Sequence, residues 1–177
     1  MILLIAGASH TGKTLLAQRL MERHGWPYLS IDHLKMGLIR SGMLSLSPSD
    51  DEALTPALWP VIREIVKTAI ENDQNLIIEG CYIPFDWRES FDGEYLPHIR
   101  ALWLIMTAEY IGAHFGDIRQ YGSAIECRGD DPDLDRDWLL RDNERNLAEC
   151  QRHGCPYLLI DGRYEVDWLI SSSEFTE

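Results

Sequence analysis

The chain has 177 residues, 45% of them hydrophobic, and a formal net charge of −13. This length and hydrophobic content suit one globular domain with its own core, spanning residues 1–177. The negative charge argues against a nucleic-acid partner and against an anionic membrane surface, because both would require a basic face.

The first predicted elements are a strand, a glycine-rich loop and a helix. Residues 2–6 are an apolar run typical of a buried strand, and apolar residues recur at helical spacing from residue 15 onward. The loop between them matches G-x-x-x-x-G-K-[ST], the phosphate-binding loop of nucleoside-triphosphate enzymes. Its residues are Gly7, Ala8, Ser9, His10, Thr11, Gly12, Lys13 and Thr14.

In this strand–loop–helix context, backbone N–H groups and the helix dipole converge on phosphate oxygens. We therefore expect residues 7–14 to bind the phosphates of ATP. Lys13 is expected to reach the β- and γ-phosphates as a catalytic cation, and the Thr14 hydroxyl to ligate Mg²⁺.

The rest of the chain alternates between predicted strands and helices. Strands are expected at residues 28–31, 75–78, 101–106 and 157–160. Helices are expected at 34–39, 88–96, 109–120 and 134–153, and after the last strand. A further long helix has an apolar face at residues 62–70; Pro56 fits its first turn, whereas Pro60 predicts a start at that residue or a kink. Alternating strands and helices imply a parallel sheet covered on both faces, with no second domain.

Acidic residues follow two of these predicted strands. Ligands of open parallel sheets bind beyond the carboxyl ends of the strands, so Asp32 and Glu79 should lie beside the phosphate loop. Asp32 could accept the proton of a hydroxyl that attacks the γ-phosphoryl group, or it could cap the following helix, a role that Ser30 could also fill. Glu79 could hold Mg²⁺ through water, or it could be a strand-end carboxylate in solvent.

Residues 121–133 have mixed polarity and are predicted to form an exposed loop that acts as a lid over the phosphates. Arg119 at its entrance could bind phosphate, and Arg128 within it could serve as a catalytic clamp on the transferring oxygens, because guanidinium geometry matches phosphate.

The cysteines and the N-terminal sequence favour a cytoplasmic protein. The four cysteines, at positions 81, 127, 150 and 155, form no C-x-x-C pair, so reduced thiols are expected. We find no signal-peptide pattern, and the apolar run at 101–106 is too short to cross a bilayer.

These segments resemble the small P-loop kinases of the adenylate kinase and shikimate kinase type. The closest likeness is to 2-phosphoglycerate-kinase-like, chloramphenicol-phosphotransferase-like and zeta-toxin-like members. The resemblance rests on residues 7–14, 30–32 and 76–80 and on the arginine-bearing lid, and it covers the whole chain in the order of elements. Only the phosphate loop is a specific motif.

The resemblance implies a P-loop NTPase fold, an α/β/α sandwich of three layers around a mainly parallel five-stranded sheet in the order 2-3-1-4-5. It also implies that Asp32 contacts or deprotonates the acceptor and that lid arginines contact ATP. The chain departs from adenylate kinases, because residues 79–84 replace the D-G-F-P-R segment. It also lacks the N-K-x-D motif of GTPases.

The sequence thus predicts an ATP-dependent phosphotransferase that uses Mg²⁺ and acts on a hydroxyl of a small molecule, while the acceptor and the oligomeric state stay open. The competing interpretation is a nucleotide-binding regulatory or hydrolytic module that transfers phosphate only to water. Dependence of ATP turnover on an added metabolite would distinguish the two.

Overall fold

The computed structural model describes residues 1–122 and 134–164, and its strands form one parallel sheet. The strand order is β2-β3-β1-β4-β5, as expected from the resemblance. The strands are β1 (Ile2–Gly7), β2 (Tyr28–Ser30), β3 (Leu76–Glu79), β4 (Ile99–Met106) and β5 (Tyr157–Ile160).

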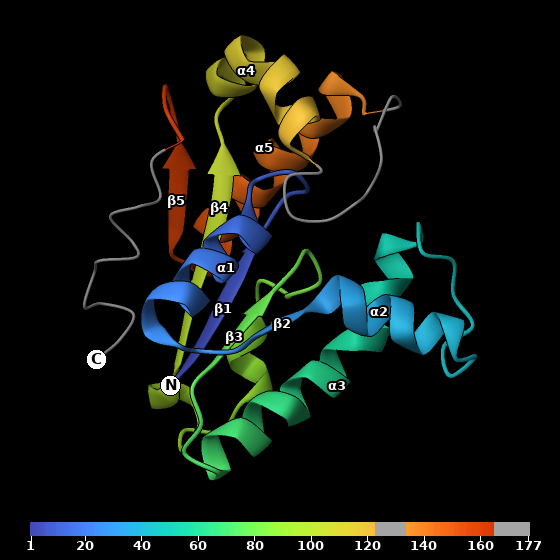
Figure 1. The fold of residues 1–177 in the computed structure, drawn as a ribbon, viewed down its shortest axis with the longest axis vertical. Helices are drawn as coiled ribbons and strands as arrows, with labels where there is room; N and C mark the ends of the chain where they lie inside the picture. Colours follow the sequence, from blue (N-terminus) through green and yellow to red (C-terminus); the bar gives the residue numbers. More distant parts are fainter. Residues whose placement is uncertain (123–133, 165–177) are drawn as a thin grey trace.

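Helices connect the strands and cover the sheet. In the described part of the chain they are α1 (Lys13–His24), α2 (Ile31–Arg40), α3 (Asp51–Glu71), α4 (Ala108–Tyr121) and α5 (Arg136–His153), with 3₁₀ turns η1 (Trp87–Ser90) and η2 (Leu96–His98). Figure 1 shows α4 beyond the carboxyl ends of β4 and β5, whereas α2 projects from the opposite side of the sheet. None of the described helices is both long and apolar enough to cross a membrane.

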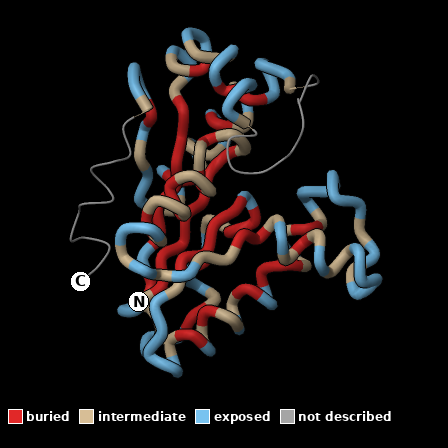
Figure 2. Tube along the Cα trace, viewed as in Figure 1, coloured by how far each residue is buried: buried red, intermediate tan, exposed pale blue. Residues whose placement is uncertain are grey.

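The core has two layers, one on each face of the sheet. All six residues of β1 are buried, and they alternate between the layers. Ile2 and Leu4 belong to the layer that contains the apolar face of α3, whereas Leu3 and Ile5 belong to the layer that contains α1 and part of α4. The buried trace runs through the centre of the sheet in Figure 2. Burial on both faces explains why the strands read as continuous apolar runs, and it confirms the predicted sandwich.

The boundaries of the second and third strands differ from the prediction in a way that affects the site. β2 ends at Ser30, and α2 begins at Ile31, so Asp32 lies in the first turn of α2 rather than at a strand exit. Ser30 has extended backbone angles and occupies the N-cap position. Glu79 is the last residue of β3 rather than the first residue after it.

Two predictions about helices were wrong. α3 begins at Asp51 and runs to Glu71, so it starts earlier than either Pro56 in the first turn or a start at Pro60 predicted. The buried face of the helix, which includes Leu58 and Ile62, stabilises it by packing in the core. At its N-terminus the Asp50 side chain accepts a hydrogen bond from the Ala53 N–H. Packing therefore outweighs the backbone hydrogen bonds lost at proline. The helix predicted at residues 88–96 is replaced by η1 and η2, while the helix predicted after β5 falls largely outside the described residues.

Candidate active site

The phosphate loop connects β1 to α1 and adopts left-handed backbone angles at three positions. Gly7 has a φ of 132°, and a Cβ there would collide with the backbone carbonyl of Leu104 on β4. Gly12 has a φ of 80°, and a Cβ there would collide with the Tyr164 hydroxyl. His10 has a φ of 64°, which is uncommon for a residue with a side chain. Gly7 is thus required by both its backbone angle and the lack of space, and Gly12 mainly by its backbone angle.

Lys13 is folded back into the loop. The residue is 6% exposed, and its ammonium donates to the Ala8 carbonyl at 2.6 Å. The Thr11 hydroxyl donates to the same oxygen at 2.9 Å. Gly7, Ala8 and Thr11 are buried, so they shape the loop from beneath. The other five residues of the loop line a cavity; they are Ser9, His10, Gly12, Lys13 and Thr14.

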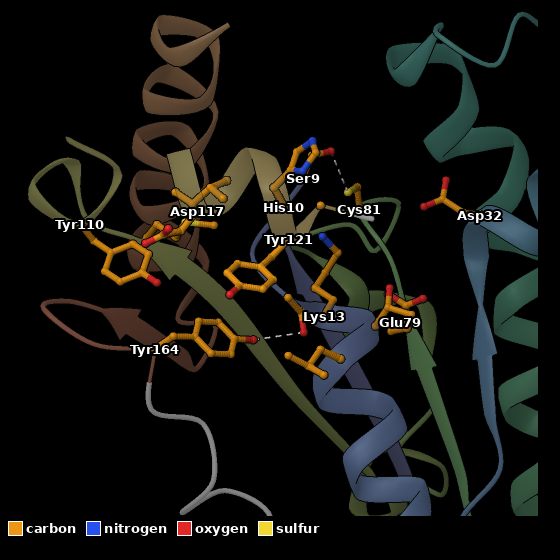
Figure 3. Close-up of a pocket in the computed structure, with 16 residues that line it drawn as sticks. Ser9, His10, Lys13, Asp32, Glu79, Cys81, Tyr110, Asp117, Tyr121 and Tyr164 are labelled. Carbon is orange, nitrogen blue, oxygen red and sulfur yellow. Dashed lines mark hydrogen bonds between the residues drawn. The ribbon is translucent and has the colours of Figure 1, made fainter. Parts of the chain in front are cut away.

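This cavity has a volume of about 380 Å³ and joins two chemically different walls. Asp32, Glu79 and Cys81 line one wall. The other wall is largely aromatic and apolar, and its residues are Met106, Tyr110, Asp117, Ile118, Tyr121 and Tyr164. Figure 3 shows Lys13 between the two, with Glu79 and Asp32 on one side and the three tyrosines on the other. The arrangement offers carboxylates, a cation and a flat aromatic surface within one space.

Glu79 is held in a buried and incompletely paired position. It stands opposite Ile5 and Ser30 in the sheet register and is 2% exposed. Burial raises the pKa of Glu79; the nearby Ser30 hydroxyl and the Lys13 ammonium oppose this shift, and Asp32 adds to it. Within the described residues, neither Glu79 Oε1 nor Ser30 Oγ has a hydrogen-bond partner.

The unpaired oxygen of Glu79 fits a Mg²⁺ site shared with Thr14. Buried polar atoms normally find partners, so an unpaired carboxylate oxygen on a cavity wall indicates a ligand. No group of three or more His, Cys, Asp or Glu side chains in the described part of the chain could hold a metal by itself. This donor set suits Mg²⁺, which retains waters and takes substrate phosphates as ligands.

Asp32 is paired with a neighbour on its own helix. Its carboxylate Oδ1 lies 2.6 Å from Lys35 Nζ, and its side chain is 27% exposed. Because Ser30 is the N-cap residue, the alternative role of Asp32 as the cap of α2 is not what the structure shows. Its place in the first turn still favours a negative charge through the helix dipole.

Of the two predicted lid arginines, the structure describes only Arg119. Arg119 lies on α4 with an exposed side chain and is not among the residues that line the cavity. Arg128 and residues 123–133 of the predicted lid lie outside the described residues.

The sequence analysis missed several residues around the loop. Tyr110, Tyr121 and Tyr164 reach the cavity from α4 and from the segment after β5. Tyr164 donates its hydroxyl hydrogen toward the carbonyls of Thr11 and Gly12, at 3.3 and 3.2 Å. Only the strand order brings these segments together, so no local pattern could have identified them.

Asp142 on α5 also lies near the loop. Burial raises the pKa of Asp142, and the Lys13 ammonium and the backbone N–H of Ser9 oppose this increase. The half-buried carboxylate of Asp142 is therefore a second acidic group near Lys13, besides Glu79.

The sequence matches no protein-family profile and no curated protein. Among solved structures, it is similar to the tunicamycin resistance protein of Deinococcus radiodurans, with a TM-score of 0.58, 13% identity, and coverage of 96% of this chain and 91% of that chain. The deoxyadenosine kinase of M. mycoides has a TM-score of 0.55, 10% identity, and coverage of 97% and 95%. A gluconokinase from Sinorhizobium meliloti has a TM-score of 0.50, 12% identity, and coverage of 96% and 86%.

At these identities the similarity concerns the fold. The parallel sheet order, the glycine loop between β1 and α1 and these structural neighbours agree. The chain has the fold of the small P-loop kinases of the adenylate kinase and shikimate kinase type.

Proposed function

We propose that this protein is an ATP-dependent phosphotransferase that moves the γ-phosphoryl group of Mg-ATP to a hydroxyl of a small molecule. The observation that carries the proposal is the single cavity in which the phosphate loop faces two carboxylates, Asp32 and Glu79. A phosphate-binding loop alone would also suit a hydrolytic module, whereas a separate acidic wall suits a second substrate.

Each wall has a role in the proposed reaction. The phosphates lie on the loop, with Lys13 donating to them, and the base of the nucleotide rests on the tyrosine-rich wall. Thr14 and Glu79 would hold Mg²⁺, and the bound ion would neutralise charge on the phosphates. The acceptor enters from the side of Asp32.

The reaction is an in-line displacement. The acceptor oxygen bonds to the γ-phosphorus, the bond from that phosphorus to the bridging oxygen breaks, and ADP leaves. The proton of the acceptor hydroxyl goes to the carboxylate of Asp32. Positioning and charge stabilisation supply most of the catalysis, because phosphoryl transfer requires little covalent chemistry from the protein.

Nucleotide binding is tested by calorimetric titration with a non-hydrolysable ATP analogue and Mg²⁺. Lys13→Ala should weaken binding at least tenfold, because it removes a charge-assisted contact worth about 1.5–3 kcal/mol. The fold should survive, since the Thr11 hydroxyl still donates to the Ala8 carbonyl. Equal affinity in a folded Lys13→Ala protein would contradict the proposal.

Transfer to an acceptor is tested by measuring ADP release while fractionated metabolites and pure hydroxyl compounds are added singly. We expect slow basal release and strong stimulation by one chemical class. Rapid release that no compound changes would favour the hydrolytic or regulatory alternative.

A further inference from the structure

A chain of hydrogen bonds connects Asp32 to the start of α3. Lys35 Nζ lies 2.6 Å from Asp32 Oδ1 and donates to the Tyr82 hydroxyl at 2.9 Å. The Tyr82 hydroxyl in turn donates to Asp51 Oδ1 at 2.8 Å. We call these four residues the α2–α3 relay. They come from α2, from the segment after β3 and from the first residue of α3.

The interior of the relay is buried, so its partners are fixed. Lys35 is 9% exposed and Tyr82 is 4% exposed. A buried ammonium is costly unless it is paired and hydrogen-bonded, and Lys35 finds both a carboxylate and a hydroxyl. Lys35 is therefore not a solvated surface lysine that happens to lie near Asp32.

The direction of donation along the relay is also fixed. An ammonium can only donate, so Tyr82 must accept from Lys35 and direct its own hydrogen to Asp51. Burial and the Asp51 carboxylate raise the pKa of Tyr82, which keeps that hydrogen in place. Asp32 lies at one end of an ordered path whose other end is anchored on α3.

We propose that Lys35 is a positioning residue for the acceptor's base, and that Tyr82 and Asp51 hold Lys35 in place. The inference rests on the proposed function, in which Asp32 receives the acceptor proton. The contact with Oδ1 helps to hold the side chain of Asp32 in one rotamer and so to direct its second oxygen. Small displacements of a catalytic group reduce the rate strongly, so the anchored ammonium preserves the transfer geometry.

The chain offers a matched control for this arrangement. Tyr95 also donates its hydroxyl hydrogen to a carboxylate, Glu71 Oε1, at 2.8 Å. Lys67 Nζ lies 5.4 Å from the Tyr95 ring centroid, compared with 4.9 Å for Lys35 and Tyr82. The carboxylate of this control arrangement, Glu71, does not line the cavity, whereas Asp32 does.

The test compares Lys35→Met and Tyr82→Phe with the controls Lys67→Met and Tyr95→Phe. ADP release is measured with the hydroxyl compound that stimulates the wild type most, and affinity for the ATP analogue is measured on the same samples. We expect kcat to fall by about 10- to 100-fold in Lys35→Met and by about 3- to 10-fold in Tyr82→Phe. Nucleotide affinity and the acceptor KM should change less than about twofold in both. The controls should keep wild-type kcat.

The double variant Lys35→Met/Tyr82→Phe should be no slower than Lys35→Met alone, because both changes interrupt one path. Wild-type kcat in a folded Lys35→Met protein overturns the inference. Loss of nucleotide affinity in parallel with rate also overturns it, because that pattern indicates a general structural role. If Lys35→Met does not fold, the same two results, wild-type kcat or a parallel loss of nucleotide affinity, overturn the inference when they are found in Tyr82→Phe. A wild type without acceptor-dependent ADP release instead overturns the proposed function on which the relay depends.

Discussion

The position of Asp32 in α2 excludes it as the N-cap residue, and its proposed role as proton acceptor can be tested directly. Ser30 is the N-cap residue, and Asp32 faces the cavity from the first turn while paired with Lys35. Asp32→Asn keeps the size of the side chain and an oxygen for Lys35 but removes the basicity of the carboxylate. Turnover with the acceptor should therefore fall by about 10²–10⁴-fold, the usual scale for losing a positioned base.

Three measurements on Asp32→Asn separate catalysis from stability: the thermal midpoint, the affinity for the ATP analogue and the acceptor-dependent rate. The first two should stay close to the wild type, because the phosphates are held by the loop. Near-normal turnover in the folded variant would remove Asp32 from the mechanism.

The buried carboxylate of Glu79 should destabilise the fold at neutral pH. Its pKa is raised above the ordinary value of 4.5 because the carboxylate is buried. The folded state then holds the proton more tightly than the unfolded chain, so stability falls as the pH rises from 4.5 through the raised pKa, and the penalty persists above it. Glu79→Gln should raise the free energy of unfolding at pH 7 and flatten its pH dependence in this window.

The same Glu79→Gln substitution should weaken Mg²⁺-dependent binding of the ATP analogue, because the amide is a poorer ligand for the cation. Urea denaturation at several pH values measures the first effect and calorimetry the second. Glu89→Gln, which changes an exposed carboxylate on η1, is the control. A Glu79→Gln protein less stable than the wild type at pH 7 would show that the charged form is stabilised in the fold.

At the scale of elements, the β1–loop–α1 unit depends on close packing against β4. Gly7 has a φ of 132° and leaves no room for a Cβ beside the Leu104 carbonyl, whereas Gly25, with a φ of 70°, has nothing within 4 Å of a Cβ. Gly7→Ala should therefore cost more than about 3 kcal/mol of stability, because backbone strain and a clash with backbone combine. Gly25→Ala should cost about 1 kcal/mol from the angle alone.

Equilibrium denaturation of the two alanine variants measures this difference. Equal losses would mean that β4 moves to accommodate the extra carbon. Such movement would separate the phosphate loop from the sheet, so nucleotide affinity should be measured on both proteins.

The helices and strands also show why the sequence predicts some parts of the fold correctly and others not. β1, the loop and α1 are contiguous, so periodicity and one motif define them together. The end of β2 was misplaced by one residue because Ile31 is apolar in either a strand or a helix. The continuous α3 was missed because its stability comes from distant buried partners rather than from local propensity.

The sequence predicts the residues of the cavity walls less completely than those of the phosphate loop. Asp32 and Glu79 could be found because parallel strands bring their carboxyl ends to one edge. Tyr110, Tyr121 and Tyr164 are separated along the chain and meet only through the sheet order. The relay through Tyr82 depends on side-chain directions that no spacing in the sequence specifies.

At the scale of the whole molecule, the charge distribution bears on which acceptor can bind. The chain carries a net charge of −13, and the acidic wall of the cavity adds Asp32 and Glu79. Among the described residues near that wall, Lys13 serves the nucleotide in our proposal and Lys35 is paired with Asp32 and Tyr82. An anionic acceptor would meet like charge, which costs several kcal/mol at a desolvated interface.

We therefore expect the acceptor to be a neutral or amino-bearing hydroxyl compound. The test uses three analogues of the compound that the acceptor screen identifies, with the same skeleton and a hydroxyl, an amine or a carboxylate away from the reacting oxygen. The carboxylate should have a kcat/KM at least about tenfold below the neutral analogue, equivalent to about 1.4 kcal/mol. A preference for the carboxylate would contradict this expectation and would require a further cation at the site. Arg128 would then be the first residue to replace, because a guanidinium pairs with a carboxylate through two parallel hydrogen bonds.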